Sequence, residues 1–108
     1  MYKKDRLQGT LDLLVLKTLT RGPQHGFGIT MHIENVTGGA LRFQEGSLYP
    51  ALQRMQNEGW VTAEWKTTEN NRRARYYTLT DAGRRQLEAE QEHWRRVTGA
   101  VEVVLNHV

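Results

Sequence analysis

Cysteine is absent from the 108-residue sequence, which excludes disulfide bonds and thiolate metal ligands and fits a reducing compartment. Long hydrophobic runs are also absent. The longest run, residues 13–16, is too short to span a bilayer, and no signal-peptide pattern precedes it. From these absences we expect a soluble, cytoplasmic protein without a membrane partner.

Apolar residues are scarce for a globular chain, at 38% of the sequence. This length suggests one domain with a modest core, so part of the surface is expected to be long polar helix or to face nucleic acid. The net charge is only +3, yet residues 66–85 carry six basic and two acidic residues. A basic segment of this kind favours a polyanionic partner, although charge alone is a weak signal.

The most informative stretch is residues 45–60, which has a helical pattern with a start and a stop. Pro50 is tolerated only near a helix start, and Gly59 is a typical stop signal. The apolar stripe at helical spacing consists of Leu48, Ala51, Leu52 and Met55. The sequence therefore predicts a helix over residues 47–57 with one core face and one polar face.

The polar face of this helix carries the first set of candidate DNA contacts. They are Ser47, Tyr49, Gln53, Arg54 and Asn57. Hydroxyl groups near a helix start favour phosphate oxygens, so we assign Ser47 and Tyr49 to the backbone. The remaining three have side chains that read base edges. The alternative is an ordinary solvated face.

Two further helices are expected before it. Residues 1–8 read as a polar arm, and residues 10–20 form a helix that is apolar nearly all round, so a second subunit could cover one side. A second helix is expected over residues 27–35, with Ile29 and Ile33 in the core and Phe27 or Val36 nearby. Leu41 and Phe43 are expected to pack inward after a glycine loop.

After Gly59 the apolar period changes from 3.6 to 2, which predicts a β-hairpin with its tip at residues 68–72. Its candidate DNA contacts are Lys66, Arg72, Arg73 and Arg75. Arginines at the end of a stiff ribbon are typical of a phosphate or minor-groove clamp, and the alternative is a solubilising loop. Arg75 is the least certain, because strand alternation could turn it toward Trp65.

A last helix is expected from Asp81 almost to the C-terminus, with Thr80 as its cap. Apolar residues recur along it at seven-residue spacing and in the intervening seam positions, with Glu90 as the polar exception. Such a seam favours pairing with another subunit, and packing back on its own domain is the alternative. The candidate interface residues are Leu11, Leu14, Leu87, Trp94, Val97, Val101 and Val104.

The sequence offers no assembly of nucleophile, base and orienting group, and no phosphate-cradling glycine loop. Glu90 and His93 could face each other, but they are only a partial metal-ligand set. We therefore expect no enzyme activity, no metal site and no cofactor.

Three segments together resemble the PadR family of bacterial transcriptional regulators: residues 24–29 (QHGFGI), 45–52 (EGSLYPAL) and 71–83 (NRRARYYTLTDAG). The resemblance implies an α+β, mainly α winged helix-turn-helix over residues 1–79, and a dimerisation helix over residues 80–108. It implies a homodimeric repressor whose third helix enters the major groove of a two-fold-related DNA site. The alternative is a winged helix used only for protein interaction.

The chain resembles the short subgroup of this family, with one terminal helix. Short members can admit flat aromatic compounds at the dimer interface, which would make Trp94 an effector-stacking residue. We favour the plainer interpretation of Trp94 as a large apolar seam residue.

Overall fold

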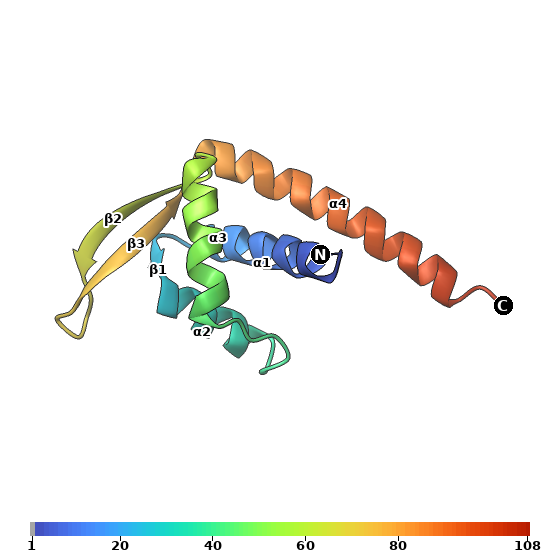
Figure 1. The fold of residues 1–108 in the computed structure, drawn as a ribbon, viewed down its shortest axis with the longest axis horizontal. Helices are drawn as coiled ribbons and strands as arrows, with labels where there is room; N and C mark the ends of the chain where they lie inside the picture. Colours follow the sequence, from blue (N-terminus) through green and yellow to red (C-terminus); the bar gives the residue numbers. More distant parts are fainter. Residues whose placement is uncertain (1) are drawn as a thin grey trace.

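The computed structural model describes the backbone of residues 2–108 and the side chains of residues 9–108. Its elements, in chain order, are α1 (Tyr2–Leu19), β1 (Gln24–His25), α2 (Gly26–Val36), α3 (Glu45–Asn57), β2 (Val61–Thr67), β3 (Arg73–Leu79) and α4 (Asp81–Leu105). Helices dominate, and a small antiparallel sheet lies at one end (Figure 1). The expected fold class, a winged helix-turn-helix with a long last helix, is confirmed.

One hydrophobic core joins all the helices to the sheet. The predicted stripe of α3 is buried as expected, and Leu48, Leu52 and Met55 have no exposed surface. From α1, Val15 and Leu16 are fully buried beside them. Because α3 buries this face, its opposite face is left to solvent.

The sheet has three strands in the order β1-β3-β2, one more than the predicted hairpin. In the hairpin, Val61 pairs with Leu79 and Thr67 with Arg73. In the third strand, Gln24 pairs with Tyr77 and His25 with Tyr76. A strand of two residues is too short to show alternation in a sequence, which is why it was not predicted.

Two expectations near the N-terminus were wrong. The helix α1 begins at Tyr2, so the stretch expected to be a polar arm is part of it. Phe27 and Val36 are 60% and 71% exposed instead of packing with Ile29 and Ile33. The core is already filled on that side by Ile29 and Ile33, which lie one helical turn apart on the buried face of α2.

The helix α4 begins with the expected cap, in which Gly83 N donates to Thr80 Oγ1 at 3.0 Å. Its first half lies along α1, and its second half extends away from the rest of the molecule (Figure 1). The molecule is consequently elongated, at 58 × 29 × 27 Å. Among the described residues, no helix has the length and apolar character needed to cross a membrane.

Candidate nucleic-acid interface

The exposed face of α3 presents a short row of polar side chains. Ser47, Tyr49, Gln53 and Asn57 all lie on this exposed side, as expected. One turn apart, Gln53 Nε2 donates to Asn57 Oδ1 at 3.1 Å, so the two amides act as one unit. A row of amide and hydroxyl groups on an exposed helix face has the chemistry that reads base edges and phosphates.

Tyr49 is held against α2 by the absence of a side chain at Gly26. A Cβ at Gly26 would lie only 2.7 Å from Tyr49 Oη. Burial raises the pKa of Tyr49, and the nearby Glu45 carboxylate raises it further. Tyr49 therefore remains a neutral phenol that can donate a hydrogen bond to a phosphate oxygen.

Arg54, which was expected to read bases, also makes a contact within the chain. Its guanidinium forms a bidentate ion pair with Asp12 of α1, with Nη1–Oδ2 at 2.8 Å and Nη2–Oδ1 at 2.6 Å. Asp12 is only 5% exposed, and its hydrogen bonds raise the pKa of Arg54. In this conformation each amino group of Arg54 donates one hydrogen bond to Asp12, so the pair fastens α3 to α1.

The tip of the hairpin is a well-bonded turn. Thr68 N donates to Arg72 O at 2.6 Å, and Asn71 N donates to Thr68 O at 3.0 Å. Asn71 adopts a left-handed backbone with φ 60°, which asparagine tolerates better than most residues, as predicted. Arg72 follows in an exposed position at the end of this rigid turn.

The basic residues of the hairpin do not share one face. Strand alternation puts Arg73 and Arg75 on the same side as the buried Tyr77, whereas Lys66 lies on the other side. There Lys66 Nζ lies 3.5 Å from a Glu64 carboxylate oxygen and 5.7 Å from the centre of the Tyr76 ring. The four predicted wing contacts are therefore split between the tip and two faces.

Arg73, and not Arg75, is the arginine that contacts Trp65. Arg73 lies over the Trp65 ring, 5.4 Å from its centre, although Arg75 was the residue expected there. Arg75 donates from Nη2 to Gln56 Oε1 of α3 at 3.3 Å, and its buried Nε has no hydrogen-bond partner among the described residues. Arg75 thus joins the wing to α3, while Arg72 and Arg73 remain exposed.

Three positions in this region were not predicted to matter. Asp12 and Gln56 bind the two inward-turned arginines, and His25 caps α2 by accepting a hydrogen bond from Gly28 N at its Nδ1. For Asp12 a signal was present, because a carboxylate inside a helix that is apolar nearly all round requires a buried partner. Nothing in the sequence identified Arg54 as that partner.

The seam of α4 is largely exposed. Trp94, Val97, Val101 and Val104 are 46%, 44%, 48% and 73% exposed, respectively. Leu11 and Leu87, which were predicted for a subunit interface, are instead buried in the core of their own chain at 4% and 6%. Both belong to the hydrophobic core of the single chain.

A cavity of about 230 Å³ lies where α1 meets α4. It is lined by Leu13, Leu14, Lys17, Gln91, Trp94 and Arg95. Leucine side chains and an indole ring provide apolar walls, and two cations border them. Within the described part of the chain, no group of three or more histidine or acidic residues could hold a metal ion.

Known proteins resemble this chain over most of its length. Residues 15–89 match the transcriptional regulator PadR-like family. The negative transcriptional regulator PadR of Bacillus subtilis is 27% identical over 77 residues, which are 71% of this chain and 42% of that protein. The chain thus spans less than half of that relative.

Solved structures agree with the family match. A PadR-like transcriptional regulator from Bacillus cereus is 27% identical, with a TM-score of 0.79 over 96% of this chain and 99% of that chain. A transcriptional regulator from Clostridium thermocellum has a TM-score of 0.82 over 91% of this chain and 95% of that chain, and at 24% identity it supports the fold alone. The chain described here belongs to the PadR-like family of transcriptional regulators, which are not enzymes.

Proposed function

We propose that the protein is a homodimeric repressor that binds a two-fold-related DNA site through α3 and the hairpin wing. The observation that carries this proposal is the exposed polar face of α3. On this face Gln53 and Asn57 are both exposed and are hydrogen-bonded to each other. The name of the Bacillus subtilis relative, a negative regulator, supports repression. Two copies of α3 would enter the major groove about one DNA turn apart, roughly 34 Å.

The geometry of the side chains suggests a division of labour. Gln53 and Asn57 specify bases, while Ser47 and Tyr49 position the helix on phosphates. Arg72 and Arg73 bind the DNA backbone from the wing, and Lys66 adds positive charge on the opposite face. Arg54 and Arg75 act indirectly, because their guanidinium groups are bonded to Asp12 and Gln56.

Gel-shift titrations on DNA from the protein's own upstream region test this proposal. Gln53→Ala should reduce the preference for that DNA over random duplex by about 1–3 kcal/mol. Arg72→Ala should weaken binding to the upstream DNA and to random duplex. It should also reduce by about 1 the magnitude of the slope of log binding constant against log salt concentration. Arg96→Ala on α4 removes the same charge away from α3 and the wing, and should change neither quantity.

If the unaltered protein bound its upstream DNA no more tightly than random duplex, specific DNA recognition would be wrong. If binding to any DNA were also insensitive to salt, a winged helix that binds proteins would be the better description.

The proposed dimer interface is the apolar seam of α4, which would pack against the same seam of a second copy. Trp94, Val97, Val101 and Val104 follow the spacing of a coiled-coil seam and remain exposed in the single chain. Leu14, which is half-buried on α1, borders the cavity beside Trp94 and would join the same interface. An apolar stripe of this length is rarely left open on a soluble monomer.

For an effector, the α1–α4 cavity favours a planar aromatic compound with an acidic group. The Trp94 ring and the two leucines suit a flat apolar body, while Lys17 and Arg95 suit a carboxylate. Phenolic acids should quench tryptophan fluorescence saturably, and Trp94→Phe should remove this response. Trp65→Phe, on the wing, is the matched control and should leave it intact. Quenching that Trp65→Phe abolished would place the ligand elsewhere.

A further inference from the structure

A second cavity lies on a part of the molecule that the proposed function does not use. It has a volume of about 220 Å³ and is lined by Thr18, Arg21, Gly22, Pro23, Gln24 and His32. These residues come from the end of α1, the following turn, β1 and α2, and none comes from α3, β2 or β3. The cavity is therefore separate from the candidate DNA contacts and from the seam of α4.

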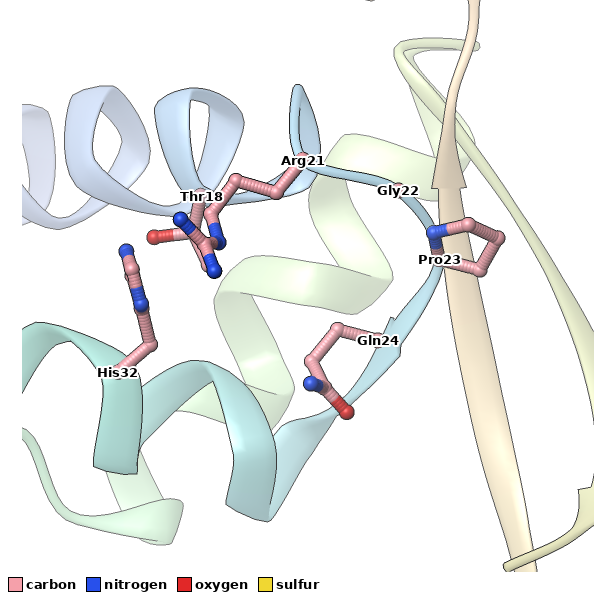
Figure 2. A pocket seen from close by; sticks show the side chains of 6 residues that line it. All are labelled: Thr18, Arg21, Gly22, Pro23, Gln24 and His32. Carbon is pink, nitrogen blue, oxygen red and sulfur yellow. The ribbon is translucent and has the colours of Figure 1, made fainter.

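Side chains that carry hydrogen-bond donors line this cavity. Figure 2 shows the Arg21 guanidinium, from the turn after α1, and the His32 ring, from α2, extending toward the same space beside Thr18. Within the described chain, neither Arg21 nor His32 has a hydrogen bond or ion pair, and Gln24 Nε2 also has no partner. Three donor groups around one hollow thus lack acceptors.

The Gln24 amide is held in place on both sides. Its Oε1 accepts a hydrogen bond from His25 N at 2.9 Å, which orients Nε2 as the free end. It also packs directly on Gly28, where any Cβ would overlap the amide. A donor that is fixed before binding loses less conformational entropy when a ligand arrives.

The charge of the lining favours an anion. Among the residues whose side chains the structure describes, no aspartate or glutamate lines the cavity, whereas Arg21 carries a permanent positive charge. The end of α1 would repel an anion if its carbonyl oxygens were open. However, the carbonyls of Lys17, Thr18 and Leu19 already accept hydrogen bonds from the amides of the following turn.

We propose that this cavity binds a small oxyanion, the phosphate or carboxylate group of a free small molecule, through Arg21, Gln24 and His32. The volume exceeds the roughly 30 Å³ that one water occupies in the liquid, so the space admits such a group. Because the lining comes from α1, β1 and α2, the occupant would connect the end of α1 to the start of the helix-turn-helix.

Nitrogen-15 NMR of the whole protein tests the proposal with inorganic phosphate and with acetate as probes. We expect saturable shifts of the Arg21 Nε–H and Gln24 Nε2 amide signals in the millimolar range, at constant ionic strength with chloride as the balancing ion. Arg21→Gln and His32→Gln should each weaken binding at least about tenfold, the effect of losing a charged hydrogen bond. Arg84→Gln, which removes an exposed charge on α4, should bind as the unaltered protein does.

Two outcomes would overturn the proposal. The first is the absence of saturable shifts with either anion while the protein remains folded. The second is a response of the Arg21 and Gln24 signals to duplex DNA alone, which would make these residues backbone contacts and not a site for a free anion. Neither readout depends on specific DNA binding, so failure of the proposed repressor function would leave this test intact.

Discussion

At the scale of single residues, hydrogen bonds within the chain decide how the arginines are oriented. Four arginines were predicted to contact DNA, and two of them turn inward, Arg54 to Asp12 and Arg75 to Gln56. A buried carboxylate without a partner is strongly unfavourable, so the pairing of Arg54 follows from the position of Asp12 in the core. Arg72 and Arg73 are exposed.

We expect Arg54→Ala to lower the free energy of unfolding by about 3 kcal/mol. This is the low end of the range for breaking a buried ion pair, because Arg54 is a third exposed whereas Asp12 is almost fully buried. The double variant Asp12→Leu with Arg54→Met should recover most of the loss, since no unpaired charge remains. Urea unfolding of both variants gives these values, and a double variant less stable than Arg54→Ala would contradict the pairing argument.

A second residue prediction concerns alkaline pH. Burial raises the pKa of Tyr77 above its ordinary value of 10.0, against a smaller opposing effect of Arg75. Above about pH 10 the unfolded chain ionises this phenol while the folded chain does not, so stability should fall as the pH rises toward the folded pKa. Between pH 10 and 11 the free energy of unfolding, measured with urea, should fall by up to about 1 kcal/mol more for the unaltered protein than for Tyr77→Phe. Equal losses in the two proteins would contradict this.

At the scale of elements, the start of α4 is fixed by the strand and turn before it. The Trp60 carbonyl accepts hydrogen bonds from Thr80 N and Thr80 Oγ1, both at 3.0 Å. Gly83 lies so close that any Cβ would overlap this carbonyl oxygen. The direction in which α4 leaves the body, and hence the placement of its seam, is set by this contact.

Two glycines of α4 should respond oppositely to alanine. Gly83→Ala should destabilise the protein by about 3 kcal/mol, because backbone atoms cannot move aside as a side chain could. Gly99→Ala has open space around the new Cβ and should stabilise by about 0.5–1 kcal/mol through helix propensity. Thermal unfolding followed by circular dichroism measures both. A stable Gly83→Ala protein would show that α4 can shift relative to Trp60.

At the scale of the whole molecule, the second half of α4 projects beyond the body and carries an apolar stripe (Figure 1). The helix is 25 residues long, about 37 Å, and its inner half already packs on α1. An apolar stripe stabilises the protein only when a second surface covers it and removes it from water. We therefore propose that a second copy of the chain covers it.

Trp94→Glu should convert the proposed dimer to a folded monomer. A carboxylate placed in an apolar seam loses its hydration on assembly, which weakens pairing strongly. Arg96→Glu also adds negative charge on α4 but lies outside the seam, so it should remain dimeric. Light scattering gives the mass and circular dichroism confirms folding. A dimeric Trp94→Glu protein would require another interface.

The fold was largely predictable because it rests on periodic patterns of apolar residues. The stripe of α3, the alternation of the hairpin and the cap of α4 are local signals, and each element appears where it was expected. The third strand was missed because two residues carry no pattern. The candidate site was less predictable, since the orientation of a long side chain depends on partners far away in the sequence.

The sequence by itself determined which faces of α3 and the hairpin are apolar, where α4 begins, and that arginines gather near the wing. These properties depend on neighbouring residues and on the geometry of one helix or strand. Only the tertiary structure decided that Arg54 pairs with Asp12, 42 positions away, that Arg75 binds Gln56, and that Leu11 and Leu87 are buried within one chain. The physical reason is that ion pairing and burial depend on distances across the folded core, which local periodicity does not encode.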